Sequence, residues 1–518
     1  MMGTKLRAFA PLCNRSLEDL VPASNFYRHL EAKLDLGFVR DLVRTTYKEC
    51  GRPSIDPRVF FKLQLVMFFE GLRSERELIK VAADRLSVRW YLGYDLDEEL
   101  PDHSSLTRIR KRYGLAVFRR FFEAIVEQCR EAGLIWGKEL YFDATQVKAN
   151  AALDSIAPRF AVEAHLNELF PDEQSAEEPC LVGEHQPIEL PVPISEAERD
   201  QLDRANEERH DWLARDGAPD RTIMRAGYRR RSDFEASSTD PDAALMAHKK
   251  GGLHFGYHDH YAVDGGKARI ILEVLATPAD VMENLPFQDM LWRACFRWQI
   301  RPRQVTGDTT YGTVENIVAV EDQGVRAYLP LPDFDRRTPF HGASYFMYDP
   351  ERDEYRCPQD HPLRRLHAKY TEGTVAYRAD AATCNACPVK TACTESSQGR
   401  LIHRSLYVEY LDRVRAYHQT AAYERAMAKR KVWVEPLFGE AKDWHGLTRF
   451  RLRGLWKVNA EALLIATGQN LKRLLRHFPL LGDLPVADAQ NHDAVPAHAP
   501  ASGPDAEERP LVRGRPTQ

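Results

Sequence analysis

Long apolar runs are missing from this 518-residue chain, and no stretch approaches the ~18 residues that would span a bilayer. The first residues include early basic side chains but no apolar core long enough for a secretion signal. Cysteine is sparse, at nine residues, which excludes a disulfide-rich scaffold and favours a reducing compartment. Because 43% of the residues are hydrophobic, a largely disordered chain is excluded as well. We therefore expect a soluble, cytoplasmic protein of several domains that does not contact a membrane.

A large net charge is also lacking, since the formal charge at pH 7 is only −4. That small value conceals an asymmetry: residues 163–200 contain eleven Asp or Glu and one Arg, whereas residues 425–476 contain twelve Lys or Arg and four acids. An anionic polymer senses such a local patch rather than the net charge. The basic segment is therefore compatible with a nucleic-acid partner, although a solvated helix face would have the same composition.

The first part of the chain, residues 1–135, is expected to be a helical domain. The run 59–72 is apolar on most sides and predicts a buried helix, and Ser74 with Glu77 forms a capping box for the next one. A third helix is predicted to begin near Ser104. Short helices joined by tight turns, with a basic helix last, are typical of helix-turn-helix-like DNA-binding units, although a helical bundle with a charged face is the alternative. The predicted DNA contacts here are Arg108, Arg110, Lys111 and Arg112.

The pattern changes to mixed strands and helices over residues 136–477. A strand is predicted at 137–150, and two further strands flank the turn at 264–267, whose Asp-Gly-Gly-Lys sequence is a strong hairpin signal. Those two strands span 253–263 and 268–277. The other predicted elements are strands at 303–312 and 326–332 and helices near 281–296, 313–323 and 407–477. This order is that of a ribonuclease-H-like fold, an α/β class with a mixed sheet flanked by helices, although other α/β folds contain similar runs.

Two segments interrupt this domain, and a third follows it. Residues 151–250 join an acidic, proline-containing stretch to the basic run 225–231 and are expected to be a partly disordered insertion. Residues 340–400 are rich in cysteine and turn residues and predict a small inserted module. The last residues, 478–518, have little apolar content, with six prolines in the final 36 residues, and predict a disordered tail.

Three acids stand where such a fold would bring them together. Asp143 lies within the first strand, Asp308 at the end of a later strand and Glu435 where a helix begins. Phosphodiester chemistry needs an activated attacking oxygen and a stabilised leaving oxygen, and two Mg²⁺ ions about 4 Å apart supply both. Mg²⁺ prefers carboxylate oxygen, so three acids and a substrate phosphate suffice as ligands. Each acid taken alone is more often an ordinary surface carboxylate.

The sequences around these acids resemble those of the DDE-type transposases of bacterial insertion sequences, and the resemblance covers nearly all of residues 20–477. The similar segments are 51–114, YFDATQVKANAALDS (141–155), SSTDPDAAL (237–245), GYHDHYAVD (256–264), ATPADVMEN (276–284), VTGDTTYGTVENI (305–317) and RKVWVEPLFGEAKDWHGLTRFRLRG (430–454). The resemblance implies that Asp143, Asp308 and Glu435 are catalytic and bind two Mg²⁺ ions, for which Mn²⁺ substitutes. It also implies binding to the element's terminal inverted repeats, cleavage at its ends and joining of the 3′-OH ends to target DNA. The expected assembly is a homodimer or larger on double-stranded DNA.

The glutamate segment has further features. Glu435 and Lys442 are seven residues apart, about two helical turns, so both face one side of a continuous helix, and the lysine would meet phosphate. Pro436 disfavours the α conformation at Glu435, which places the glutamate in the first helical turn. The family often has an arginine four residues before the glutamate, where this chain has a lysine with an arginine beside it, and Glu440 is a rival metal ligand. The remaining predicted DNA contacts are Arg430, Lys431, Arg449, Arg451 and Arg453.

A cysteine group predicts a structural metal site. Cys384 and Cys387 have zinc-knuckle spacing, and Cys393 follows six residues later. Cys357 is a fourth candidate ligand, with His361 as its rival. One branch of the resembled family has a similar cysteine-bearing insertion, which favours one structural Zn²⁺, whereas reduced and unligated thiols are the alternative. The other cysteines are expected to be buried small residues.

A histidine pair on a predicted strand has two explanations. His258 and His260 flank Asp259, and residues two apart on a strand share a face. A transition-metal site and the polar face of an edge hairpin both account for this pattern.

For the whole chain, two alternatives to an active transposase stay open. One is a domesticated DNA-binding protein without catalysis, which an assay of DNA cleavage with Mg²⁺ would separate. The other is a ribonuclease-H-like nuclease that hydrolyses DNA without joining it, which a strand-transfer assay would separate.

Overall fold

The computed structural model describes residues 15–47, 54–158, 235–247, 252–333, 335, 338–370 and 373–478. These residues belong to one compact unit that ends at Phe478. Most of the predicted insertion, including its basic run, and the predicted tail beyond Phe478 lie outside the described residues. Among the described residues, no helix is both long and apolar enough to cross a membrane.

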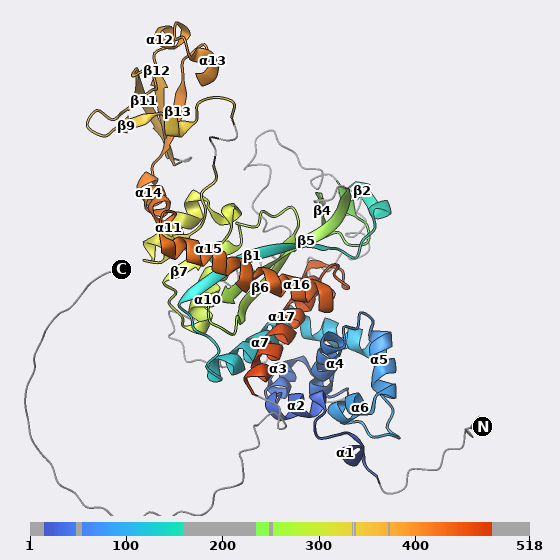
Figure 1. Ribbon diagram of the computed structural model, residues 1–518. Helices are drawn as coiled ribbons and strands as arrows, with labels where there is room; N and C mark the ends of the chain where they lie inside the picture. The colour runs from blue at the N-terminus through green and yellow to red at the C-terminus, as the bar shows by residue number, and fades with distance from the viewer. Residues whose placement is uncertain are drawn as a thin grey trace, which may run out of the picture. The chain divides into compact units, whose positions relative to one another are not determined.

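The N-terminal part is built from helices (Figure 1), and local sequence signals set their ends. Pro57 opens the apolar helix α4, whose N-cap Asp56 accepts a hydrogen bond from the Arg58 N–H. The Ser74 side chain caps α5, and Asp102 caps α7, which begins within one residue of the predicted start. The helices are α1 (Leu17–Leu20), α2 (Phe26–Lys33), α3 (Val39–Val43), α4 (Pro57–Phe69), α5 (Glu75–Asp84), α6 (Leu86–Leu92) and α7 (His103–Glu131).

A mixed sheet follows. Its strands are β1 (Glu139–Lys148), β4 (Ala244–Ala247), β5 (Leu253–Asp264), β6 (Ile271–Pro278), β7 (Gln304–Thr306) and β8 (Arg326–Tyr328). The order is β4-β5-β1-β7-β8, with β6 also paired to β5. Strands β1, β4 and β6 pair antiparallel with β5, whereas β1, β7 and β8 run parallel. The predicted strands and hairpin are therefore confirmed in order.

Several predicted boundaries were wrong. The strands expected at 303–312 and 326–332 are each only three residues long in the structure. In both segments a loop follows the short strand. The helix expected near 281–296 is α10 (Phe287–Trp298), which starts later because turns occupy the residues before it. Part of the predicted insertion is ordered: β2 (Ile156–Pro158) pairs with β3 (Glu235–Ser237), and β4 extends the main sheet along β5.

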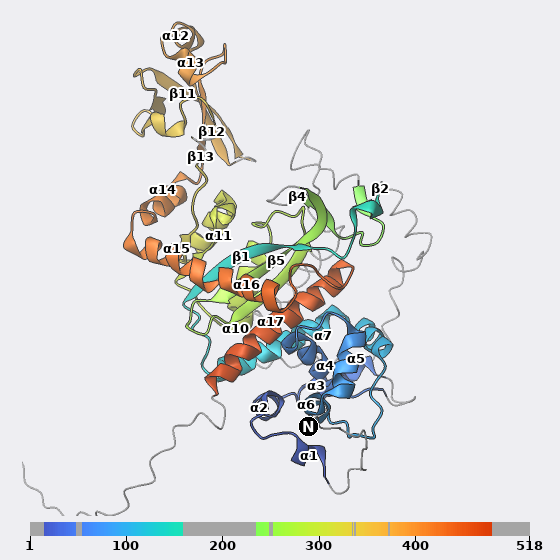
Figure 2. The ribbon, with the colours of Figure 1, turned by 45° about the vertical axis from the view of Figure 1, so that its right-hand side comes forward.

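Helices cover both faces of the sheet. On one face, Tyr261 of β5 stacks on Phe438 of α16 (Glu435–Trp444), with 4.4 Å between ring centroids. On the other, Phe142 of β1 packs edge-on against Phe287 of α10, at 4.8 Å. The remaining helices are α11 (Val314–Asp322), α14 (Val408–Tyr417), α15 (Ala421–Trp433) and α17 (Leu455–His477). Figures 1 and 2 both show α15, α16 and α17 following one another across the sheet.

Helix α17 joins the two halves of the unit. The amide side chains of Asn459 and Asn470 each donate to and accept from the backbone of β6, at Ala276 and Ile271, over 2.8–2.9 Å. These bonds satisfy backbone groups at the edge of β6 that no strand among the described residues pairs. The same helix packs on α4 and α7, so the N-terminal helices and the sheet share one hydrophobic core.

The cysteine-rich segment forms a second, smaller sheet. Its order is β13-β12-β11-β10-β9, and a separate core of Phe346, Leu363, Tyr377 and Ile402 packs within it. The elements are β9 (Met347–Asp349), β10 (Glu354–Arg356), β11 (Pro362–Lys369), β12 (Thr374–Ala379), α12 (Ala381–Asn385), α13 (Lys390–Cys393) and β13 (Leu401–Ser405). The sequence predicted a turn-rich module here but not a sheet, because the strands are short and interrupted by polar residues.

Candidate active site

The register of two parallel strands brings Asp143 and Asp308 together. Tyr141 of β1 is the partner of Thr306 of β7, and each aspartate lies two residues farther along its own chain. Because parallel strands run in the same direction, equal steps from one pair end at neighbouring positions. Asp308 leaves the sheet there and caps a short 3₁₀ turn, η5 (Thr309–Tyr311), by accepting a 2.8 Å hydrogen bond from the Thr310 N–H.

The glycine before Asp308 is required by close packing. A Cβ atom at Gly307 would lie 2.9 Å from the Tyr311 ring and 3.0 Å from a Leu329 methyl group. A larger residue at this position would therefore force the Tyr311 ring or the Leu329 side chain to move. The chain leaves β7 after Thr306 and enters the 3₁₀ turn at Thr309, which explains why the predicted strand 303–312 is short.

Glu435 reaches the same place from the C-terminal helices. It is the first residue of α16, followed by Pro436 in the first turn, as the sequence predicted. Val434 separates it from α15, so the two helices are distinct segments. The Glu435 side chain is half exposed, and its Oε1 lies 3.6 Å from Nη2 of Arg430 on α15.

Arg430 links the acids. Its Nη1 lies 3.1 Å from Oδ2 of Asp143 while its Nη2 contacts Glu435, so one guanidinium bridges two carboxylates. From the sequence, Arg430 was predicted to contact DNA, and nothing in its position along the chain indicated this bridge. The bridge depends on α15 crossing β1, which is a tertiary contact.

The electrostatics of Asp143 show that the three acids interact. Burial raises the pKa of Asp143 to about 6, the positive charge of Arg430 opposes that rise, and the charges of Asp308 and Glu435 add to it. Carboxylate oxygens are the ligands that hard divalent cations prefer. Within the part of the chain that the structure describes, however, no three His, Cys, Asp or Glu side chains are close enough to form a ready-made metal site.

Lys442 lies beside this group. Its Nζ donates a 2.6 Å hydrogen bond to Oγ1 of Thr145, which shares a sheet face with Asp143 because the two are two residues apart on β1. The cross-strand partner of Thr145 is Asp259, a fully buried carboxylate. Burial raises the pKa of Asp259, and the charge of Lys442 opposes that rise. In the sequence, Asp259 stood out only as the residue between the two histidines.

Glu440, the rival to Glu435, has other partners. Its carboxylate lies 2.5 Å from Lys472 and 3.1 Å from Arg473, both on α17, and 3.8 Å from His445. Although burial opposes them, these contacts lower the pKa of Glu440 below its ordinary value. Glu440 thus ties α16 to α17, whereas Glu435 faces the aspartates.

Two comparisons with known families place this site in context. Residues 356–475 match a family described as a transposase DDE domain, and residues 15–112 match a family described as a transposase domain (DUF772). Both matches are to transposase families, and together they support an insertion-sequence DDE transposase. The first match includes Glu435 and Lys442, whereas Asp143 and Asp308 lie between the two matched regions. No curated protein and no solved structure gives a significant match to the transposase.

The basic residues predicted to contact DNA divide into two groups. Arg108, Lys111 and Arg112 of α7 are exposed, and the Arg112 guanidinium lies 5.0 Å from the Tyr47 ring centre. Lys431, Arg449 and Arg453 are exposed near the C-terminal helices of the transposase. Arg110 and Arg451, by contrast, point inward, and assigning Arg110 to DNA was wrong because it is only 3% exposed.

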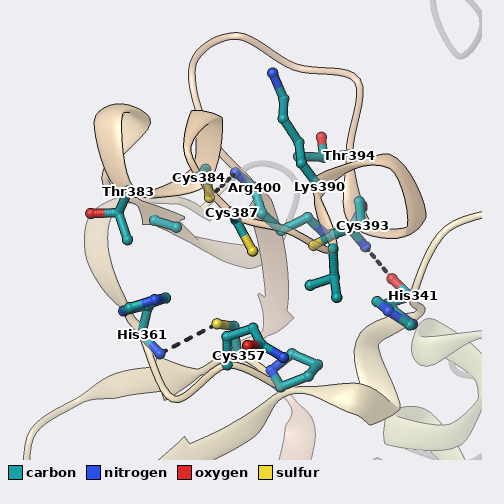
Figure 3. A pocket seen from close by; sticks show the side chains of 14 residues that line it. His341, Cys357, His361, Thr383, Cys384, Cys387, Lys390, Cys393, Thr394 and Arg400 are labelled. Carbon is teal, nitrogen blue, oxygen red and sulfur yellow. Dashed lines mark hydrogen bonds between the residues drawn. The ribbon is translucent and has the colours of Figure 1, made fainter.

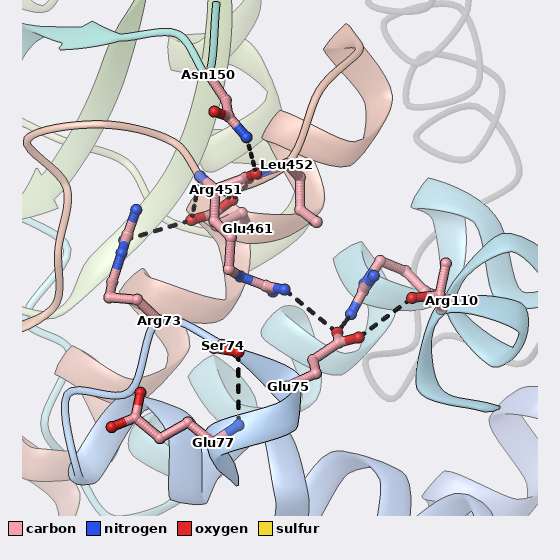
Figure 4. A network of polar contacts seen from close by, with 10 residues as sticks. Arg73, Ser74, Glu75, Glu77, Arg110, Asn150, Arg451, Leu452 and Glu461 are labelled. Carbon is pink, nitrogen blue, oxygen red and sulfur yellow. Dashed lines mark hydrogen bonds and ion pairs between the residues drawn. The ribbon is translucent and has the colours of Figure 1, made fainter. Parts of the chain in front are cut away.

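Arg110 and Arg451 belong to a network that joins the N-terminal helices to the segment after α16 (Figure 4). Both guanidinium groups bind the carboxylate of Glu75 on α5. The Arg73 guanidinium donates to the Gly446 carbonyl at 2.8 Å, and Glu461 accepts the Arg451 backbone N–H at 3.0 Å. The helices of the DUF772 match therefore contact the loop that follows the helix of Glu435 and Lys442.

The four predicted zinc ligands of the transposase line one small cavity (Figure 3), together with His361 and His341. The His361 N–H donates to Sγ of Cys357 at 3.3 Å, and the Arg400 N–H to Sγ of Cys384 at 3.5 Å. Burial raises the pKa of Cys393, and the other three cysteines add to the rise while Arg400 opposes it. The thiols thus share a site, although their positions do not form a ready-made metal centre among the described residues.

The other cysteine and histidine predictions have mixed outcomes. Cys129 is buried as expected, Cys295 is only partly buried, and Cys13, Cys50 and Cys180 lie outside the described residues. The edge-hairpin explanation of the histidine pair was wrong, because β5 pairs with strands on both sides. His258 contacts the Val281 carbonyl and His260 the Thr277 hydroxyl, while Nδ1 of His260 is buried without a hydrogen-bond partner among the described residues.

Proposed function

We propose that this transposase binds the terminal inverted repeats of its own insertion sequence, cleaves at the element ends and joins the 3′-OH ends to target DNA. The observation that carries the proposal is the register that makes Asp143 and Asp308 neighbours, with Glu435 linked to Asp143 through Arg430. Together the register and the Arg430 bridge associate three acids from separate parts of the chain, and this association is what supports the proposal.

The strand order supports the same conclusion. An antiparallel unit of β6, β5 and β1 continues through parallel β7 and β8, with helices on both faces. We infer a ribonuclease-H-like fold for residues 136–477, because its element order matches the one predicted from the sequence. The helices of residues 1–135 are inferred to be the DNA-recognition domain.

The proposed cofactor is a pair of Mg²⁺ ions, with Mn²⁺ as a substitute. The donor set fits, because Asp143, Asp308 and Glu435 offer only carboxylate oxygens and Asp143 is largely buried. When bound, such ions activate the attacking oxygen and stabilise the leaving oxygen. Asp143 and Asp308 would hold the ions at the sheet end, and Glu435 would hold them from α16. Lys442, fixed by Thr145, would orient a DNA phosphate next to them.

DNA is proposed to contact exposed basic residues on both parts of the unit. Each Lys or Arg that meets a phosphate releases counterions, which makes binding strongly dependent on salt. The assembly on DNA is proposed to be a homodimer or larger. The proposed contacts are Arg108, Lys111, Arg112, Lys431, Arg449 and Arg453.

A structural Zn²⁺ is proposed for the cysteine cavity. Cys357, Cys384, Cys387 and Cys393 provide four sulfur donors around about 20 Å³ of space, and backbone N–H groups already point at two of the sulfurs. A closed site of this kind contributes to folding rather than to catalysis.

The experiment that tests the function uses full-length protein and a labelled DNA end that carries the terminal repeat. The expected result is Mg²⁺-dependent 3′-end cleavage, followed by appearance of the label in a target plasmid. Binding without cleavage would indicate a DNA-binding protein that has lost catalysis. Cleavage without joining would indicate a nuclease.

A further inference from the structure

Arg430 stands between two side chains that are proposed to bind metal. Its guanidinium contacts Oδ2 of Asp143 at 3.1 Å and Oε1 of Glu435 at 3.6 Å. The Arg430 side chain is 13% exposed and the Asp143 side chain 14%, so the contact is shielded from solvent. Shielded charge contacts are screened less by water and salt than surface ion pairs are.

The Arg430 contacts oppose the repulsion among the acids. The charges of Asp308 and Glu435 act on the shielded carboxylate of Asp143, and like charges held close together repel one another. Arg430 is the cation that contacts two of them. It therefore stabilises an acid cluster that a divalent cation would otherwise have to neutralise.

The same contact occupies oxygen atoms that a metal would need. A carboxylate oxygen that accepts from a guanidinium is less available to a cation, and a second positive charge nearby weakens the binding of a first. Within the described residues, Nε of Arg430 is buried without a hydrogen-bond partner. The guanidinium is thus held mainly by its contacts with Asp143 and Glu435. If a metal ion took over these carboxylates, the guanidinium would lose its main contacts.

We propose that Arg430 is a built-in competitor of the metal ions, which holds Asp143 and Glu435 in the DNA-free transposase and gives them up when metal binds. The released guanidinium then takes a DNA phosphate as its partner. This inference rests on the proposed function and adds regulation to it: the acids are kept assembled, but metal binds tightly only when DNA offers Arg430 another anion. Arg430 is a positioning residue in this scheme, because it acts through Asp143 and Glu435.

The test is a titration of full-length, DNA-free protein with Mn²⁺, in which free Mn²⁺ is followed by electron paramagnetic resonance. Wild type is compared with Arg430→Gln, Arg430→Lys and Lys431→Gln. Lys431 is the exposed neighbour, so its variant controls for the removal of one positive charge. Asp143→Asn is also introduced into wild type and into each variant. The Mn²⁺ binding that this change removes is assigned to the site that contains Asp143.

Arg430→Gln is expected to bind this Mn²⁺ roughly three- to ten-fold more tightly than wild type. Lys431→Gln should change the affinity less than two-fold, since an exposed charge is largely screened. Arg430→Lys retains the charge without the two-pronged geometry and should fall between wild type and Arg430→Gln. Circular dichroism establishes folding, and if Arg430→Gln is unfolded the comparison of Arg430→Lys with Lys431→Gln decides.

Equal or weaker Mn²⁺ binding by both Arg430 variants would overturn the inference while leaving the proposed function intact. Absence of any Asp143-dependent Mn²⁺ binding in every background would overturn the proposed function, and the inference with it.

A second readout is the salt dependence of terminal-repeat binding. With Ca²⁺ present, the slope of log affinity against log salt should be smaller for Arg430→Gln than for wild type by about one phosphate contact, and with EDTA the slopes should agree. Equal slopes with Ca²⁺ would contradict the transfer of Arg430 to DNA.

Discussion

Lys442 donates a 2.6 Å hydrogen bond from its Nζ to Oγ1 of Thr145, which lies two residues after Asp143 on β1. A long, flexible side chain is thereby held at a defined place beside the acids. The bond reduces the conformational entropy that the lysine would lose when it binds a phosphate.

Lys442→Ala should slow end cleavage by about ten-fold, because it removes one charged interaction with the phosphate. Thr145→Val should slow it only about two- to three-fold, because the lysine remains but is less well placed. Neither change should alter Asp143-dependent Mn²⁺ binding. Kinetics of 3′-end cleavage provide the measurement, with Lys138→Ala, an exposed lysine just before β1, as the control. Abolished Mn²⁺ binding in Lys442→Ala would show that the lysine acts on the metal site instead.

The basic residues of α7 should fall into two groups, residues that bind DNA and residues that stabilise the fold. Alanine at Arg108, Lys111 or Arg112 should each lower the slope of log affinity against log salt by about 0.9, the value expected for a single phosphate neutralised on duplex DNA. Arg110→Gln should leave that slope unchanged but destabilise the protein by about 3 kcal/mol, because it breaks a buried pair with Glu75. Fluorescence anisotropy and urea unfolding measure the two effects. A reduced salt slope in Arg110→Gln at unchanged stability would refute the division.

Purified transposase should contain about one zinc per chain if the cysteine cavity binds Zn²⁺. Cys384→Ser should lower the zinc content and destabilise the small sheet, whereas Cys295→Ser, on α10, should leave zinc unchanged. Elemental analysis of dialysed protein is the measurement. Full zinc retention in a variant that lacks both Cys384 and Cys387 would refute the site.

Stability without metal should depend on the protonation of Asp143. Its pKa is about 6 in the folded protein against an ordinary 3.8, so between these values the folded chain holds a proton that the unfolded chain has released. The contribution of Asp143 to the free energy of unfolding should therefore fall as pH rises from about 4 to about 6, by at most about 3 kcal/mol.

Asp143→Asn lacks this titration, so its stability relative to wild type should increase across that pH window. Urea unfolding in EDTA at several pH values tests the sign. A constant difference between the two proteins would show that the Asp143 pKa is not raised.

The sequence predicts the three acids because the segments around them resemble those of DDE transposases, and their catalytic role stays a prediction. Asp143 lies within an apolar strand, Asp308 precedes a turn, and Glu435 precedes a proline at a helix start. The order of these elements along the chain follows from the hairpin signal and the alternation of strands and helices. The position of α15 over β1, and with it the Arg430 bridge, depends on packing between distant segments and has no local signature.

The inward position of Arg110, by contrast, does have a signal in the sequence. Leu106, Ile109 and Tyr113 are all buried, at the three- and four-residue intervals of one helix face before the kink at Gly114. Arg110 falls on that face, whereas the exposed basic residues fall beside it. A cluster of basic residues in a helix therefore has to be divided by face before any member is assigned to DNA.

The central claim is that Asp143, Asp308 and Glu435 act together in catalysis, and 3′-end cleavage of a labelled terminal repeat tests it most directly. Asp143→Asn, Asp308→Asn and Glu435→Gln keep the side-chain shape but remove the charge that would hold Mg²⁺, so each should abolish cleavage and joining while DNA binding persists. Glu440→Gln should still cleave, because its carboxylate serves the contacts to Lys472 and Arg473. Normal cleavage by all three variants would contradict the mechanism, and normal cleavage by Glu435→Gln beside an inactive Glu440→Gln would contradict the choice of the third acid.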